Sequence, residues 1–171
     1  MTRAFLLSFV TRQVLLSPRE KVAASYRHSW LVWEPGAWVA PPPGLHMTLV
    51  PAPPQEAMRP VQGDALCFEL ALTEGQTGLR LGRAADCDLV INDGTVSRSH
   101  LWLTREPEDW AAQVLPSSRG ATSDGRVLSP GTRLPLRRGT RLQLGDVVLT
   151  YYDPQGLLLR AAEQGARAIR H

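Results

Sequence analysis

The chain has 171 residues, and a hydrophobic fraction of 43% is enough for a packed core, so the composition excludes a chain that is disordered throughout. The formal net charge is only +3, and residues 64–153 carry ten cationic side chains against twelve anionic ones. A slightly acidic middle argues against a surface for duplex nucleic acid, so we expect no nucleic-acid partner and only a local anion site there.

The two cysteines, Cys67 and Cys87, have no CxxC partner, and the four histidines are scattered, which argues against a metal site. This cysteine usage is typical of a reducing compartment. The apolar run from Ala4 to Val10 is at the short limit for a signal peptide, and no segment approaches the roughly 20 apolar residues that span a bilayer. We therefore expect a cytoplasmic protein without a membrane partner.

Residues 1–50 indicate a small N-terminal α/β extension. Apolar side chains at helix-compatible spacing predict an amphipathic helix over residues 4–16. Ser17-Pro18-Arg19-Glu20 has the form of a capping box, which predicts a second short helix that ends near Tyr26. Three tryptophans follow within nine residues, and we interpret them as packing residues rather than as a ligand platform. Strands are expected over residues 30–33, 37–39 and 45–50.

A proline-rich linker over residues 51–63 separates this extension from a different pattern over residues 64–153. There, short strand patterns alternate with turn residues, which predicts an all-β sandwich. The strands are expected at 66–70, 79–81, 88–91, 100–103, 110–115, 133–136, 140–144 and 147–152. Residues 154–171 form a C-terminal tail with a short, weakly amphipathic helix that Gly165 interrupts.

One constellation within the strand region points to chemistry. Leu81-Gly82-Arg83 is followed, fourteen residues after the arginine, by Ser97-Arg98-Ser99-His100. A phosphoryl group carries a charge of about −1.5 to −2 and three strong acceptor oxygens. An arginine offers a planar donor fork that stays charged, and a serine hydroxyl adds a short hydrogen bond. Such a set suits holding a phosphate at the rim of a sheet rather than breaking a bond.

The order and spacing of these motifs resemble those of a forkhead-associated (FHA) domain of bacterial type, over about half the chain. The motifs are Gly82-Arg83, Ser97 to His100, Ser117 to Ala121, Asp124-Gly125 and the ending Leu136 to Asp146. The resemblance implies an FHA-like sandwich of two antiparallel sheets, with the helical segments at either end as additions. It also implies recognition of phosphothreonine, without a cofactor.

The resemblance assigns roles residue by residue. Arg83 and Ser97 would bind the phosphate, Ser118 takes the family's threonine position, and Arg98 would add a second cation. Arg119 stands where the family usually has asparagine. It either adds a phosphate contact, displaces the peptide, or marks a domain that has lost phosphate recognition. We expect four further residues to support the loops structurally: Gly82, His100, Gly120 and Gly125.

The leading hypothesis is an adaptor in Ser/Thr kinase signalling that binds threonine-phosphorylated proteins, either the kinase or its substrates. A phosphate-independent scaffold on the same sandwich is the alternative, motivated by Arg119 and the tryptophan-rich extension. An enzyme with Ser97 and His100 as a nucleophile pair is the weakest interpretation, because no orienting acid, oxyanion loop or nucleophile elbow is evident. We therefore expect no enzymatic activity. Self-recognition through a phosphorylated Thr2, Thr11 or Thr48 is a further hypothesis.

Overall fold

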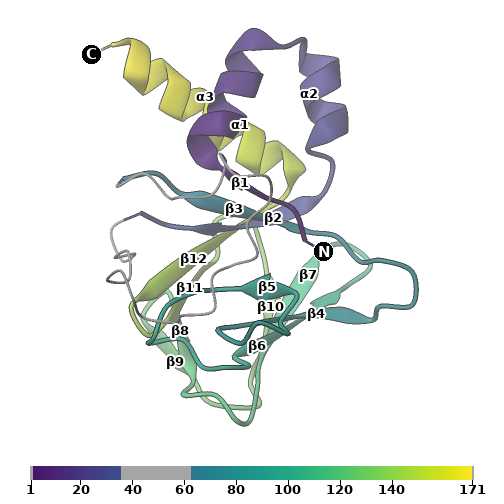
Figure 1. Cartoon of the computed structure of the whole chain (residues 1–171), viewed down its shortest axis with the longest axis vertical. Helices are drawn as coiled ribbons and strands as arrows, with labels where there is room; N and C mark the ends of the chain where they lie inside the picture. Colours follow the sequence, from purple (N-terminus) through teal and green to yellow (C-terminus); the bar gives the residue numbers. More distant parts are fainter. Residues whose placement is uncertain (1, 36–62, 171) are drawn as a thin grey trace.

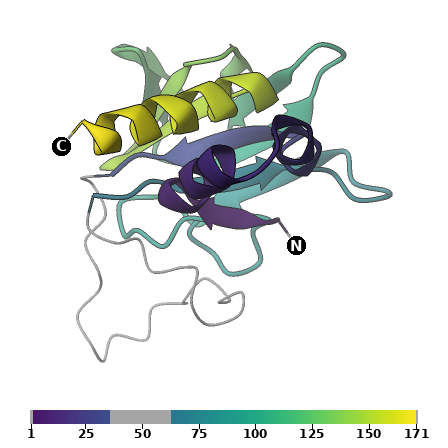
Figure 2. The same ribbon diagram turned by 90° about the horizontal axis from the view of Figure 1, so that it is seen from above.

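Two β-sheets pack face to face, and three helices cover the outer face of the larger sheet (Figures 1 and 2). The computed structural model describes residues 2–35 and 63–170. The strands expected at 37–39 and 45–50, and nearly all of the expected linker, lie outside the described residues.

The two sheets confirm the predicted all-β sandwich. The larger sheet has the strand order β1-β3-β2-β12-β11-β8-β9, and the smaller has the order β10-β7-β6-β4-β5. All neighbouring strands are antiparallel except the parallel pair of β4 and β5. The strands of the larger sheet are β1 (Ala4–Leu6), β2 (Ser29–Trp33), β3 (Leu66–Leu70), β8 (Ala121–Ser123), β9 (Arg126–Leu128), β11 (Arg141–Leu144) and β12 (Val147–Tyr152). Those of the smaller sheet are β4 (Gly78–Gly82), β5 (Leu89–Val90), β6 (Leu101–Arg105), β7 (Trp110–Val114) and β10 (Arg133–Leu136).

The N-terminal elements differ from the prediction at both helix starts. The helix α1 spans Leu7–Leu16, and the residues before it form β1, which pairs with β3. The capping box was also wrong, because α2 (Arg19–Ser25) has Pro18 at its N-cap and no side-chain cap. The hydroxyl of Ser17 instead donates to Gln13 of α1, at 3.3 Å between oxygens.

The C-terminal helix α3 (Pro154–Ile169) is longer than predicted and continues through Gly165. The carboxylate of Asp153 caps it by accepting from the Gly156 amide at 2.8 Å. A Cβ on Gly165 would lie 3.0 Å from Cδ1 of Leu15, so the glycine lets α1 and α3 approach closely. Among the described residues, no helix combines the length and apolar character that crossing a bilayer requires.

The strand β2 is buried on both faces, which explains its continuous apolar run. Leu31 and Trp33 belong to the core between the sheets, whereas Trp30 and Val32 pack under the helices. The sequence grouped this strand with the N-terminal extension, but the structure places it inside the larger sheet, between β3 and β12.

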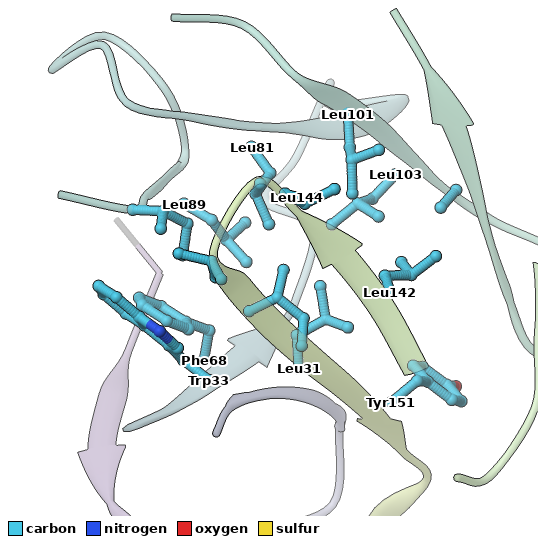
Figure 3. Packing of buried hydrophobic residues seen from close by; sticks show 14 of the residues in the cluster. Leu31, Trp33, Phe68, Leu81, Leu89, Leu101, Leu103, Leu142, Leu144 and Tyr151 are labelled. Carbon is cyan, nitrogen blue, oxygen red and sulfur yellow. The ribbon is translucent and has the colours of Figure 1, made fainter. Parts of the chain in front are cut away.

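The core between the sheets is built from large aliphatic and aromatic side chains of both layers (Figure 3). Leu31, Phe68 and Tyr151 extend from the larger sheet toward Leu81 and Leu103 of the smaller one. All five are at most 2% exposed. Dense packing of this kind fixes the ends of the strands, and therefore the loops that leave them.

A partly buried ion pair joins the helical layer to the sheet. The guanidinium of Arg160 in α3 donates to both carboxylate oxygens of Glu34, at 2.5 and 2.6 Å. The Thr150 hydroxyl also donates to Glu34, at 2.6 Å. Burial raises the pKa of Glu34, but the hydrogen bonds from Arg160 and Thr150 outweigh it, so the pKa lies below its ordinary value.

This pair predicts an acid-sensitive contribution to stability. Because the folded-state pKa of Glu34 is lowered, its contribution is present above the unfolded-state value and is lost as the pH falls through the folded-state value. Glu34→Gln should lower the free energy of unfolding at neutral pH by about 1–3 kcal/mol. It should also flatten the loss of stability between about pH 5 and pH 3, measured by urea unfolding with tryptophan fluorescence.

The matched control is Glu163→Gln, which alters an exposed glutamate of the same helix. It should leave the unfolding free energy and its pH slope unchanged. An unchanged acid slope in Glu34→Gln would contradict the assigned role of this pair.

Candidate functional site

Three loops of the sandwich meet at the residues that the sequence singled out. The loop after β4 begins with Arg83, the loop between β5 and β6 contains Ser97, and the loop between β7 and β8 contains Arg119. The amide of Arg83 donates to the carbonyl of Ser97 at 2.9 Å. The amide of Arg119 donates to the Ser97 hydroxyl oxygen at 3.1 Å. Ser97 is therefore bonded to both neighbouring loops.

The side chain of Ser97 is left with its hydroxyl proton. Its Oγ accepts from the Arg119 amide, which fixes the oxygen but uses none of its donor capacity. The residue is only partly buried. It can therefore donate one hydrogen bond to an acceptor at the surface.

One hydrogen bond, made by Nε, orients the guanidinium of Arg83. Its Nε donates to the Val96 carbonyl at 3.3 Å, and the side chain is partly exposed. Within residues 2–35 and 63–170, its terminal nitrogens have no hydrogen-bond or ion-pair partner. The arginine thus keeps its planar donor edge available for an anion.

His100 joins two of the loops from inside the protein. Its ring is fully buried, Nδ1 accepts from the Ser97 amide at 3.0 Å, and Nε2 lies 2.7 Å from the Gly120 carbonyl. We assign the proton to Nε2, because a carbonyl only accepts. Burial lowers the pKa of His100, the Gly120 bond opposes that shift, and the charge of Arg119 lowers it further.

This geometry argues against Ser97 and His100 as a nucleophile pair. Both ring nitrogens of His100 are bonded to backbone groups, so neither is free to accept the Ser97 hydroxyl proton. These bonds place His100 between the loops of Ser97 and Gly120, and the role predicted for it was to support the loops.

Ser118 and Arg98 lie in the same loops, but their recorded contacts are local. The Ser118 hydroxyl oxygen accepts from the Gly120 amide at 3.3 Å. Arg98 is exposed, and its carbonyl accepts from the Ala84 amide at 3.0 Å and from the Cys87 thiol at 3.2 Å. The structure therefore brings Arg83, Ser97 and Arg119 together, and places Ser118 and Arg98 beside them.

The predicted glycines serve different backbone requirements. A Cβ on Gly82 would lie 2.2 Å from the Arg98 carbonyl oxygen, so only glycine lets β4 lie this close to the loop between β5 and β6. Gly120 has φ +86°, a conformation that L side chains rarely adopt. Gly125, with φ +80°, follows Asp124 with φ 48° and forms the turn between β8 and β9.

Thr95 forms a second brace of the Ser97 loop, which was not predicted from the sequence. Thr95 donates its hydroxyl to the Asp93 carboxylate at 2.5 Å and accepts from the Asp146 amide at 2.9 Å. The Asp93 carboxylate also accepts from the Thr95 amide at 2.8 Å. This local turn was detectable as an aspartate two residues before a threonine, but its contact with Asp146 depends on the fold.

Metal-ligating side chains do not gather in the part of the chain that the structure describes. No group of three or more His, Cys, Asp or Glu residues there has a geometry that would hold an ion. The candidate site offers hydrogen-bond donors and cations instead.

The chain is similar in sequence to a protein family and to a curated protein. A family model described as "Inner membrane component of T3SS, cytoplasmic domain" matches residues 61–155. An FHA domain-containing protein of Arabidopsis thaliana is 31% identical over 88 residues, which cover 51% of this chain and 22% of that protein. The chain thus spans about a fifth of the length of this curated relative.

Solved structures were also compared with the chain. The crystal structure of the FHA domain of a Chlamydia trachomatis protein has a TM-score of 0.48 at 17% identity, over 74% of this chain and 97% of that one. Mycobacterium tuberculosis EmbR, solved in complex with a low-affinity phosphopeptide, has a TM-score of 0.41 at 23% identity, over 45% of this chain and 20% of that one.

The close approach at Gly82 generates a prediction about loop order. Gly82→Ala should lower the free energy of unfolding by about 1–3 kcal/mol or more, because its methyl group would meet backbone that is itself hydrogen-bonded. Urea unfolding measures the loss, and amide hydrogen exchange should show faster exchange at Arg83 and Ala84. Gly94→Ala is the matched control, since a Cβ there meets nothing within 4 Å. Equal effects of the two substitutions would contradict the steric role of Gly82.

Proposed function

This chain belongs to the family of the inner membrane component of T3SS, cytoplasmic domain, which has an FHA-type fold, and we propose that it is a phosphothreonine-dependent protein-binding module. In this proposal it acts as an adaptor in Ser/Thr kinase signalling in a bacterial cytoplasm. Its partner is a threonine-phosphorylated protein, either the kinase or one of its substrates.

The observation that carries the proposal is the contact between the loops of Arg83 and Ser97. Their backbone bond of 2.9 Å makes the two residues neighbours, and the guanidinium of one and the hydroxyl of the other each keep donor capacity for a ligand. A phosphoryl group accepts several hydrogen bonds and carries nearly two negative charges, so it matches this pair better than a neutral ligand does.

The electrostatics of the loops favour an anion. Arg83, Arg98 and Arg119 lie on adjoining loops and are partly or fully exposed. His100 adds no charge to the site, because burial lowers its pKa and favours the neutral ring. The site thus combines one hydrogen-bonded cation, Arg83, with two exposed cations on adjoining loops.

The strength of such binding is expected to be modest. One or two charge-assisted hydrogen bonds contribute about 1.5–3 kcal/mol each, which suits reversible association rather than permanent assembly. The rest of the affinity must come from peptide residues beside the phosphothreonine.

A phosphate-independent scaffold is the second candidate, and two observations favour it. Arg119 replaces the asparagine usual in FHA domains, and an arginine donates but does not accept. The matching family is also described as a component of T3SS, and a component of a larger assembly binds other proteins of that assembly. Phosphatase treatment separates the candidates, because only the scaffold would keep its partner.

The burial of Thr11 argues against self-recognition through a phosphate on that residue. Thr11 is buried in α1 at 8% exposure, which a kinase cannot reach in the folded protein. Thr48 lies outside the described residues, and Thr2 is partly exposed.

Calorimetric titration with phosphothreonine peptides and their unmodified counterparts tests the proposal. The phosphorylated form should bind, the unmodified form should not, and Arg83→Ala should weaken binding about tenfold to a hundredfold. Arg126→Ala, at an exposed arginine of β9, is the matched control and should change little. Equal binding of both peptide forms, no binding of either, or full affinity in Arg83→Ala would contradict phosphothreonine recognition.

Arg119→Asn tests how this chain contacts the remainder of the peptide. The backbone bond from residue 119 to Ser97 survives the substitution, so folding should be unchanged. The loss of an exposed cation should weaken phosphopeptide binding by about tenfold or less. A phosphopeptide-library screen should show changed preferences beside the phosphothreonine. The same affinity and the same preferences in Arg119→Asn would show that Arg119 does not contact the peptide.

A further inference from the structure

Exposed apolar side chains are concentrated on the helical layer. Six large hydrophobic residues are exposed among the described residues, and five of them belong to α1 and α3. The five are Phe9, Leu15, Leu16, Leu159 and Ile169, with exposed fractions of 45, 51, 72, 51 and 76%. Single exposed apolar residues are ordinary on protein surfaces, but a concentration on two adjacent helices marks an interaction surface.

The packing of the helices directs these side chains outward. Figure 2 looks onto the layer, with α1 and α3 side by side above the sheet. Their inner faces are occupied by Leu7, Val10, Leu157 and Ala161, all buried against the sheet. Leu15 reaches across to Gly165, so the two helices form one continuous surface. The remaining faces of both helices are therefore turned toward solvent.

Exposed cations outnumber exposed anions on the helical layer. Residues 2–28 and 154–170 carry six exposed cationic side chains outside the recorded ion pairs, against two exposed anionic ones. The cations are Arg12, Arg19, Lys21, Arg27, Arg167 and Arg170, and the anions are Glu20 and Glu163. Arg12 lies four residues before Leu16 on α1, and Arg170 directly follows Ile169, so the two kinds of side chain are interleaved.

We propose that the outer face of α1 and α3 docks peripherally on an anionic lipid bilayer. Leucine, isoleucine and phenylalanine side chains gain by entering the boundary between headgroups and acyl chains. Arginine and lysine side chains around them meet the negative lipid phosphates and can extend along the interface. A bilayer needs no matching shape, which suits a surface where apolar and cationic groups alternate.

Charge argues for a bilayer over a second copy of this chain. In a two-fold symmetric dimer the same patch faces itself, which would oppose cations to cations at the rim. An anionic bilayer has the complementary sign over the whole surface.

Peripheral docking departs from the expectation of no membrane partner. That expectation was based on the length of the apolar runs, which does not bear on a helix that lies in the plane of the interface. The amphipathic pattern over residues 4–16 was the only sign of this surface in the sequence. Which of its apolar residues stay exposed depends on how α1 packs against α3.

Vesicle co-sedimentation of the full chain tests the proposal. The probes are vesicles of phosphatidylcholine alone and vesicles that contain about 30% phosphatidylserine. The chain should sediment with the anionic vesicles only, and binding should weaken as the salt concentration rises above about 0.1 M. Arg12→Gln combined with Arg170→Gln should weaken binding about thirtyfold. Leu16→Ser combined with Ile169→Ser should weaken it at least about tenfold.

The matched controls lie on β9, on the sandwich and not on the helices. Val127→Ser alters the sixth exposed hydrophobic residue and Arg126→Gln an exposed arginine, and neither should affect sedimentation. Thermal unfolding confirms that each variant is folded. Phosphopeptide affinity should be the same in all helical-layer variants, which separates this proposal from the proposed function.

Three results would overturn the proposal. The first is equal sedimentation with neutral and anionic vesicles, or none with either. The second is full binding by both helical-layer variants. The third is a concentration-dependent dimer in light scattering that the Leu16 and Ile169 substitutions abolish, which would make this face a contact between copies of the chain.

Discussion

The geometry of the candidate site depends on one buried imidazole. His100 accepts from the Ser97 amide and donates to the Gly120 carbonyl, so its ring sets the distance between two loops whose bonded residues are 23 positions apart in sequence. Both partners are partly buried backbone groups, and losing the ring would leave both without this hydrogen bond. The neutral ring that burial favours is the form that makes both bonds. Arg83 and Arg119 join the same network through Ser97, so the placement of these three residues depends indirectly on His100.

The main residues of the site were predictable from their motifs, through the resemblance to FHA domains. Strand pairing explains why their loops meet: β4 pairs with β6, so the loop that follows β4 and the loop that precedes β6 lie at the same end of neighbouring strands, and these loops carry Arg83 and Ser97. The bond from the Arg119 amide to Ser97 was not predictable. It requires a loop conformation that Gly120 adopts at φ +86°, and no local pattern in Ser117 to Arg119 indicates it. Spacing therefore located the site, and loop geometry determined which donors remain free.

The fold was predictable where strands are long and alternate with turns. The strands β3, β10 and β12 have the bounds that the sequence indicated, whereas β8 and β9 have three residues each and were missed. The pair Asp124-Gly125 is typical of a tight hairpin turn and could have indicated these two strands. We had interpreted it instead as one of the FHA motifs. At the N-terminus, Phe5 and Leu6 have helical spacing relative to Phe9 and Val10, yet pairing with β3 gives their backbone more hydrogen bonds than a frayed helix start would.

The helical layer and the sandwich are one structural unit, because β2 is shared by both. β3 and β12 are not neighbours, so the larger sheet is continuous only through β2. The outer face of that strand exposes Trp30 and Val32 unless α1 and α3 cover it, and both side chains are fully buried under them. Removing the helices would therefore cost the burial of these residues and weaken the sheet from which the site loops extend. A surface on α1 and α3 is thus held in a fixed relation to the loops of Arg83 and Ser97, so a partner bound at one is presented in a constant orientation to whatever binds at the other.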